Sequence, residues 1–530
     1  MPTSFRLAVT TLDKLTRRRR ATGLLLSALL AMAPSSTFSQ DNPSKVGKWD
    51  SPFNWPNVGI HMHVLPDGTV MFWGRREWGP NAPLPNPEPG RPSLDPHECT
   101  PRIWDPQNPT APPQALQSPA LRGTPDQVNL FCSGHTFLPD GRLLVVGGHL
   151  DDFRGSHKVR IYDPVTKTWA VGPPMGAPGE GGRWYPTAVT LPDGGVLVVS
   201  GADQKKNQNT KLQIFKDGMW TSIAEFIGIP LYPMLHVAPD GRVFLSGPSK
   251  ERKTQLLDTS TGQWQVIGDT FNGKDRDYGS SVMYDVGKVV VIGGGIPPQK
   301  TAEMIDLNQP APVWQDAGEM SIGRRHHNAT ILPDGTVLVN GGTSGMGGPN
   351  QGFNDVTTPV KTAELWDPST KKFTLMAAES VPRLYHSTAV LLLDARVLSA
   401  GGGEYRPDNV AENDPKDSRR EVQIFSPPYL FRGPRPDITS APDSVTYGQV
   451  FEMGTSHPEE VGQVNWVRLS SVTHAFNQGQ RINFLAFTSD GGKLKVTAPP
   501  NSKVCPPGHY MLFVLNKDKV PSIARMITVH

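Results

Sequence analysis

Seven positions of this sequence share one register, and six of them carry side chains that can do chemistry. Each lies seven residues before the residue that opens a recurring turn. In chain order they are Gly59, Cys132, Tyr185, Tyr232, Tyr278, His326 and His386. A hydrophobic repeat would place Val or Leu there, whereas this register holds a thiol, three phenols and two imidazoles. Tyr385 adds a phenol directly before His386. Imidazole and phenolate suit copper or iron, so the register predicts a redox metal site wherever these positions meet in space.

The turn that defines this register belongs to a phrase that occurs seven times. Five copies have Pro-Asp-Gly, an apolar run and then Gly; they lie at 65–74, 138–148, 191–201, 238–247 and 332–342. Two degraded copies lie at 284–294 and 392–402. An apolar run also precedes each turn. Each copy therefore predicts two strands joined by a tight hairpin.

A second phrase follows the glycines and consists of a strand, a polar turn and an aromatic residue. Examples lie at 160–169, 212–220, 256–264 and 364–373. Four strands in each of seven repeats predict a seven-bladed kelch-type β-propeller. The first strand of each propeller blade lines the central channel, so equivalent positions on successive blades form one ring. The thiol, the phenols and the imidazoles are thus expected to converge on the axis.

Composition agrees with an all-β chain of two domains. The 530 residues include 53 Gly and 53 Pro, and 37% are hydrophobic. So many turn residues favour short strands over helices, and the apolar content excludes wholesale disorder. We expect the propeller over residues 40–428. Residues 429–530 read as short alternating strands, which predict a C-terminal Ig-like β-sandwich.

The first 39 residues read as an export signal. A basic run from Arg17 to Arg20 precedes an apolar stretch from Leu24 to Ala33, which is too short to span a bilayer. The arginine run also permits the twin-arginine route. This leader holds six basic residues and one acidic residue, which more than accounts for the formal net charge of +3. We therefore expect no nucleic-acid binding, and a mature protein that is secreted or periplasmic without a membrane span.

Several segments resemble those of a known family. FCSGHTFLPDGRLLVVGG (131–148) looks like its cross-linked cysteine segment, and GRWYPTAVTLPDG (182–194) like its cross-linked tyrosine segment. RLYHSTAVLLLDARVLSAGG (383–402) looks like its Tyr-His pair, and VTHAFNQGQR (472–481) like the loop that brings a second histidine. The chain thus resembles, over residues 55–530, the copper radical oxidases, the group of galactose oxidase and glyoxal oxidase. The Arg-Trp-Tyr sequence around Tyr185 is closer to the glyoxal oxidase branch.

This resemblance implies a site and an activity. It implies that a thioether joins Cys132 to Tyr185 as a protein-derived radical cofactor, and that one copper ion is held by Tyr185, Tyr385, His386 and His474. It also implies an enzyme that oxidises small aldehydes or primary alcohols with O2 and releases hydrogen peroxide, with Tyr385 as the general base. No counterpart of the galactose-binding residues is clear, so galactose is not the expected substrate. We expect a monomer.

We expect other residues near these motifs to have structural roles. We expect Tyr232 and Tyr278 to plug the channel, His326 and His327 to line it, and His61 and His63 to be satisfied structural histidines. Trp184 adjoins Tyr185, but strand alternation predicts that it points away, and no other tryptophan is identified to stack on the cross-link. Cys99 and Cys505 lie in different domains and are either two thiols or one disulfide.

Two other classes of function remain open on the residues alone. One is a non-catalytic kelch propeller that binds carbohydrate or protein, and the other is a propeller hydrolase. A pure binding module has no reason to keep a Cys-Tyr-His set on its axis. A hydrolase would place paired carboxylates there.

Overall fold

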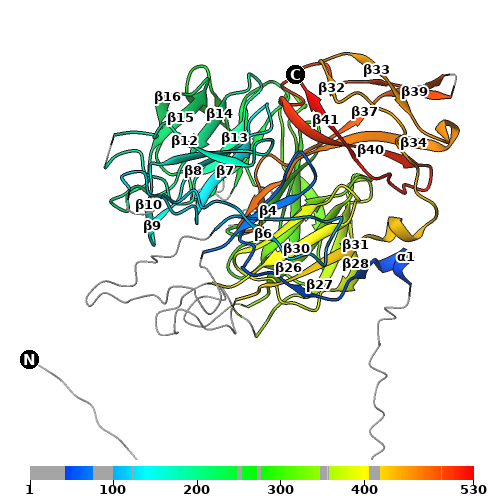
Figure 1. The fold of residues 1–530 in the computed structure, drawn as a ribbon, viewed down its shortest axis with the longest axis horizontal. Coiled ribbons are helices and arrows are strands. Elements are labelled where there is room, and N and C mark those ends of the chain that lie inside the picture. Colours follow the sequence, from blue (N-terminus) through cyan, green and yellow to red (C-terminus); the bar gives the residue numbers. More distant parts are fainter. Residues whose placement is uncertain are drawn as a thin grey trace, which may run out of the picture. The chain divides into compact units, whose positions relative to one another are not determined.

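The computed structural model describes the chain from residue 42 onward, with gaps. The described residues are 42–75, 100–121, 124–177, 179–247, 253–270, 276–345, 355, 357–404, 418–490 and 492–530. Figure 1 shows strands almost throughout this part of the chain. Its helical elements are α1 (Pro43–Val46) and two 3-10 turns, Pro428–Phe431 and Pro458–Glu460. The protein is therefore all-β, as predicted, and the expected export signal lies outside the described residues.

Seven sheets of the described chain share one plan, in which four antiparallel strands pair in order. The first three consist of β3 (His61–Val64), β4 (Val70–Trp73), β5 (Arg102–Trp104) and β6 (Gln114–Ala115); β7 (Ser133–Phe137), β8 (Leu143–Gly147), β11 (Val159–Asp163) and β12 (Thr168–Gly172); and β13 (Thr187–Thr190), β14 (Val196–Val199), β15 (Lys211–Lys216) and β16 (Met219–Glu225). The next three consist of β17 (Met234–Val237), β18 (Val243–Gly247), β19 (Lys253–Asp258) and β20 (Gln263–Asp269); β21 (Ser280–Asp285), β22 (Lys288–Ile292), β23 (Thr301–Asp306) and β24 (Gln315–Glu319); and β25 (Arg325–Ile331), β26 (Val337–Thr343), β27 (Thr362–Asp367) and β28 (Lys372–Ala378).

The seventh sheet joins distant parts of the chain. It pairs β29 (Ser387–Leu391), β30 (Val397–Gly401) and β31 (Glu421–Ser426) with the N-terminal strand β1 (Lys48–Trp49), and β2 (Phe53–Asn54) pairs with β31 as well. The small hairpin of β9 (His149–Asp151) and β10 (Arg154–Gly155) stands apart from these sheets. First strands of successive sheets contact one another, as β7 does β13 and β25 does β29, and β29 also contacts β3. The seven predicted hairpins are therefore the first two strands of seven sheets.

Residues beyond 440 form two further sheets. One orders β32 (Ser444–Val445), β41 (Arg525–Val529), β40 (Gly508–Asn516), β34 (Val461–Arg468) and β37 (Ile482–Leu485), and the other orders β33 (Val450–Gly454), β39 (Lys493–Thr497) and β38 (Phe487–Asp490). They share a core that contains Trp466, Tyr510 and Cys505. Cys505 is fully buried and in no disulfide. Cys99 lies outside the described residues.

A buried arginine recurs in the segment that enters the first strand of four sheets. These arginines are Arg183, Arg276, Arg324 and Arg383. In one example the guanidinium of Arg324 donates to the carbonyls of Gly341 (3.2 Å) and Thr362 (3.0 Å) and pairs with Glu364 at 2.5 Å. Each arginine thus ties the loop before the first strand to the second and third strands of the same sheet. We call each of these buried arginines with its hydrogen bonds an arginine clamp, and it fixes the turn that precedes the first strand of its sheet.

We expect Arg324→Met to destabilise the protein by about 3–5 kcal/mol, because the change leaves the buried carboxylate of Glu364 without its charge partner. Denaturant unfolding provides the measurement. The double variant Arg324→Met/Glu364→Met should recover part of the loss. Arg142→Met is the control, because the side chains of its pair with Asp140 are 46% and 50% exposed, and it should cost less than about 1 kcal/mol. Equal losses in the two single variants would contradict the clamp.

Candidate active site

The residues of the shared register lie in tight turns with an unusual backbone. Six of them have a left-handed φ: Cys132 (62°), Tyr185 (65°), Tyr232 (45°), Tyr278 (54°), His326 (60°) and His386 (68°). Gly59, the seventh position, is not among the positive-φ residues of the described chain. Side-chain-bearing residues rarely adopt this conformation, and a fold keeps it only where the surroundings enforce it. We call these six the ring residues.

This backbone corrects one expectation. The side chains were expected to project from the first strand of each sheet, but five of the six ring residues lie in the turn just before it, and only His326 lies within its strand, β25. Backbone hydrogen bonds join several of these turns. The N–H groups of Tyr185, Tyr232 and His326 donate to the carbonyls of Cys132 (2.9 Å), Tyr185 (2.8 Å) and Tyr278 (2.9 Å).

Two phenols and two imidazoles converge within this ring. The hydroxyls of Tyr185 and Tyr385 contact each other, and Nε2 of His474 lies 2.8 Å from the Tyr185 hydroxyl. The ring of His386 stacks on that of Tyr385 at 3.8 Å and lies 4.5 Å from that of His474. All four side chains are buried. The structure therefore brings together the four residues that sequence reasoning named as metal ligands.

Hydrogen bonds orient both imidazoles. Nδ1 of His386 lies 2.7 Å from the carbonyl oxygen of Gly403, to which it donates, and this leaves the lone pair on Nε2. Nδ1 of His474 lies 2.6 Å from the hydroxyl of Thr473. Metal-binding histidines commonly use one ring nitrogen in this way, which directs the other toward the metal. Two imidazoles and two phenols held so are a donor set that fits copper.

His474 reaches the site on a hairpin from the C-terminal part of the chain. β35 (Ser471–Thr473) and β36 (Phe476–Asn477) extend the first sheet, because β35 pairs with β3. His474 and Ala475 form the tip, with φ values of 51° and 63°. The N–H of Ala475 donates to the carbonyl of Ser387, and its carbonyl accepts from the hydroxyl of Ser280, both at 2.9 Å. No repeat marks this residue, so the resemblance was the only signal that found it.

Trp184 corrects another expectation. Its ring stacks on that of Tyr185, with centroids 3.6 Å apart and planes 8° apart. The alternation argument failed because Tyr185 is not in an extended strand, so neighbouring side chains need not point to opposite sides. Cys132 is fully buried in the same cluster. Burial, and then the nearby Cys132 thiol, raise the pKa of the Tyr185 phenol well above its usual value.

A cavity of about 470 Å³ opens onto this site. Tyr185, Tyr232, Tyr278 and His474 are among its lining residues. Its other lining residues include Phe153, Lys206, Leu231, Asp277 and Phe476. A larger hollow of about 820 Å³, which includes Trp104 and Pro112, shares no residue with it. Tyr232 and Tyr278 therefore line this cavity, and their role as plugs of a channel stays a prediction.

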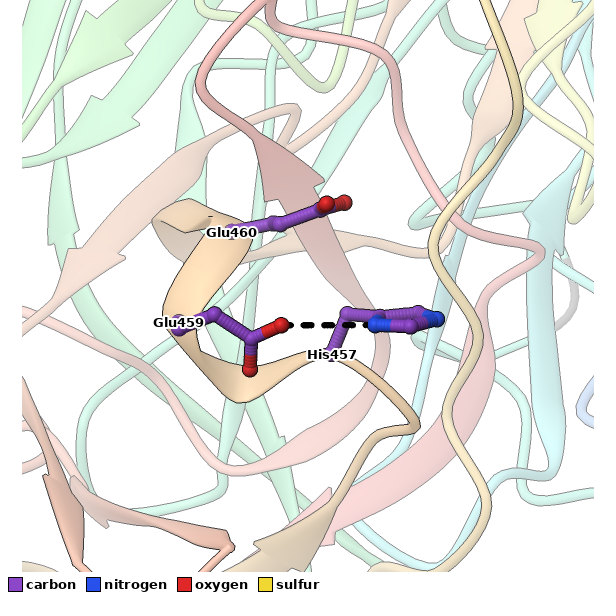
Figure 2. Close-up of side chains that lie close together, drawn as sticks. All are labelled: His457, Glu459 and Glu460. Atoms are coloured by element: carbon purple, nitrogen blue, oxygen red, sulfur yellow. Dashed lines mark hydrogen bonds and ion pairs between the residues drawn. The ribbon is translucent and has the colours of Figure 1, made fainter.

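One other group in the described chain has the spacing of a metal site. His457, Glu459 and Glu460 lie close together beside a 3-10 turn, and Nδ1 of His457 is 3.3 Å from a carboxylate oxygen of Glu459 (Figure 2). All three side chains are exposed. Water competes for such charges, and exposed pairs of this kind contribute little. The buried cluster is therefore the better candidate.

Two other buried histidines differ in how far their ring nitrogens are satisfied. Nδ1 of His61 lies 3.0 Å from Nε2 of His135, and its Nε2 accepts from the N–H of Cys132. Nδ1 of His63 lies 3.2 Å from the hydroxyl of Ser471, but its Nε2 has no hydrogen-bond partner among the described residues, so only His61 is fully satisfied. The centroid of the His326 ring lies 5.2 Å from that of the Tyr385 ring, which places it beside the candidate site, and its role in a channel wall stays a prediction. His327 is fully buried as well.

Comparisons with known proteins agree with this geometry. Residues 60–429 match the family model "Glyoxal oxidase N-terminus", and residues 435–529 match "Galactose oxidase-like, Early set domain". The chain therefore belongs to the copper radical oxidases, the family of glyoxal oxidase and galactose oxidase.

Relatives extend over most of the chain. "Aldehyde oxidase GLOX" of Vitis pseudoreticulata is 30% identical, over 90% of this chain and 97% of its own. A "Galactose oxidase" of Gibberella zeae is 28% identical, over 76% of this chain and 61% of its own. A solved structure, "Novel fungal alcohol oxidase with catalytic diversity among the AA5 family, in complex with copper", is 26% identical with a TM-score of 0.76, over 92% of this chain and all of its own.

We expect acid to destabilise the metal-free protein through its buried histidines. Burial lowers the pKa of His61 and His63 well below the usual value, and lowers the pKa of His135 and His236 to about 3. Unfolding restores a pKa of about 6.5, so the unfolded chain binds more protons below that pH. The free energy of unfolding should thus fall from pH 7 to pH 5, by up to about 1.4 kcal/mol per pH unit for each histidine. Denaturant unfolding at several pH values checks this, and a flat profile would contradict it.

Proposed function

We propose that this chain is a copper radical oxidase in which Tyr185, Tyr385, His386 and His474 hold one copper ion. The carrying observation is the contact of both phenol hydroxyls beside Nε2 of His474, in a buried cluster that the His386 ring completes. We further propose that a thioether joins Cys132 to Tyr185 and that the pair forms the radical cofactor. Their shared cluster and the stacked Trp184 support this.

The residues divide the work of a two-electron oxidation. Copper bound here would supply a one-electron redox couple and a position that polarises the substrate oxygen. Tyr385 takes the proton of the substrate hydroxyl. Burial raises the pKa of its phenol well above the usual value, so it acts as a base only while the positive charge of a metal stabilises its phenolate.

Tyr185, as a radical, then takes a hydrogen atom from the substrate carbon. A sulfur substituent delocalises this radical, and the Trp184 ring covers one face of it. An alcohol R–CH2OH and O2 thus give the aldehyde R–CHO and H2O2, and a hydrated aldehyde gives the acid. The protein supplies geometry and shielding from water.

The seven similar sheets also support a proposal for the architecture of the chain. We interpret them as the blades of a kelch-type propeller over residues 40–428, because the seven sheets share one plan and the first strands of most neighbouring sheets contact, as β13 does β17 and β21 does β25. We interpret the two sheets within 429–530 as an Ig-like sandwich. The export signal at 1–39 would make the mature protein secreted or periplasmic, and we propose a monomer. No helix of the described chain is long and apolar enough to cross a membrane.

Small aldehydes of the glyoxal type are the first substrates to expect, and primary alcohols the second. A match to the glyoxal oxidase model over residues 60–429 supports this order. The cavity lining combines apolar side chains such as Phe153 and Leu231 with polar ones such as Lys206, Gln208 and Asp277, which suits a small polar substrate.

The copper ligands can be tested without any substrate. The wild-type protein should bind one copper per chain, and His386→Ala and His474→Ala should each lose most of it, because each removes one of two imidazoles. Metal analysis after dialysis measures the content. His457→Ala is the control, since it removes the exposed histidine of the other candidate group. Full copper in both site variants would refute the assignment.

The activity can be tested with a peroxidase-coupled assay of copper-loaded protein across aldehydes and primary alcohols. Wild type should release H2O2. Tyr385→Phe should keep the fold and most of the copper but lose turnover by about 10²-fold or more, since the base is gone. Cys132→Ala should keep copper and lose most activity. Wild-type turnover in either variant would remove that residue from the mechanism, and peroxide from no substrate would favour a binding module.

A further inference from the structure

The N–H group of Cys132 departs from the bonding of its neighbours in the ring. Three other ring residues donate their N–H to the carbonyl of the preceding ring residue. For Cys132 the preceding register position is Gly59, whose carbonyl accepts instead from the hydroxyl of Thr388 at 2.7 Å. Cys132 donates to Nε2 of His61, at 3.1 Å. The imidazole of His61 therefore accepts the N–H of Cys132, as a backbone carbonyl accepts the N–H of each of those three ring residues.

His61 is rigidly held for this role. It lies at the start of β3, is fully buried, and stacks on Trp73 with centroids 5.0 Å apart and planes 11° apart. Its other nitrogen, Nδ1, lies 3.0 Å from Nε2 of His135. Both of its nitrogens are thus engaged within the protein, so His61 serves no metal.

The hydrogen bonds assign the protons along a chain. Nε2 of His61 accepts from Cys132, so the proton is on Nδ1 and is donated to His135. His135 then carries its proton on Nδ1, which lies 2.7 Å from the hydroxyl of Ser471. Burial lowers the pKa of both imidazoles, so both rings are neutral, as this chain requires. Ser471 is in β35, the strand that leads into His474.

We propose that His61 is a positioning residue for the Cys132–Tyr185 thioether, holding the left-handed turn of Cys132 through its N–H group. The inference rests on the proposed function. In the cross-linking step the S–H bond of Cys132 and a ring C–H bond of Tyr185 break and a C–S bond forms. The two electrons and two protons pass to O2, which becomes H2O2, while copper is bound.

The turn needs this acceptor because its conformation is costly. Cys132 has a φ of 62°, which a side-chain-bearing residue keeps only under external constraint. Without the imidazole, the buried N–H loses the acceptor at Nε2 of His61, and one constraint on the left-handed turn is removed. A small displacement of the thiol then slows a reaction that requires close approach to one carbon of Tyr185.

His63 provides a matched control. It is in the same strand, is equally buried, and stacks on the same Trp73, at 4.7 Å. Its Nδ1 bonds to Ser471 at 3.2 Å. His61→Phe and His63→Phe therefore make the same change in the same packing, but only the first removes the acceptor of Cys132. His61→Gln keeps an acceptor near the position of Nε2.

The experiment follows cross-linking with time. Each protein is prepared without copper, given Cu(II) in air, and sampled into chelator and acid. After reduction, alkylation and digestion, mass spectrometry gives the ratio of Cys132–Tyr185 linked peptide to alkylated Cys132 peptide. A thioether survives reduction, so a disulfide is not mistaken for it. Copper content is measured on the same samples.

We expect His61→Phe to bind copper normally and to link about 10- to 100-fold more slowly than wild type, with His63→Phe near wild type and His61→Gln recovering most of the rate. His61→Gln and His61→Leu are a second pair, which decides the question if the phenylalanine variant does not fold. Equal rates in His61→Phe and wild type overturn the inference, as does equal slowing in the two phenylalanine variants. No link in copper-loaded wild type instead refutes the cofactor itself, and the inference falls with it.

Discussion

The site depends on one backbone conformation repeated around the ring. Six successive register positions have a left-handed φ, and five of them lie in the turn just before the first strand of a sheet. Such a conformation is unfavourable for every residue type found there, so it must be enforced from outside. The backbone bonds between ring residues and the buried arginines behind them provide that constraint. The surrounding sheets therefore stabilise the conformation of the ring residues, although their strands do not take part in the proposed chemistry.

The constraint also explains the choice of side chains. A rigid turn limits where a side chain can reach, so the ring brings a thiol, phenols and imidazoles together with little loss of entropy on metal binding. The same rigidity stacks Trp184 on Tyr185 and seats Cys132 in their cluster. Under the proposed function, neutral imidazoles with directed lone pairs complete a buried donor set, in which electrostatic interactions are stronger than in water.

Many of these features could be predicted because the sequence contains seven similar repeats. The seven hairpin repeats, five of them with Pro-Asp-Gly, located the first two strands of seven sheets, and the register picked out Cys132, Tyr185 and His386. His474 lies outside the repeats and was reached by resemblance alone. Trp184 was misplaced because sequence periodicity assumes extended strands, and a left-handed residue breaks that assumption. The roles of His61 and of the recurring arginines depend on pairings across the fold, which no local pattern encodes.

The hairpin that carries His474 also determines when the site can exist. Tyr185 and His474 are separated by 289 residues, and β35 pairs with β3, near the other end of the chain. The seventh sheet, which contains β29, β30 and β31, likewise includes β1 from the N-terminal part of the chain. A growing or truncated chain lacks the second imidazole and cannot assemble the donor set. Under the proposed function, oxidative chemistry would begin only after the whole polypeptide has been made and has folded, so the partly folded chain would not be exposed to its own cofactor.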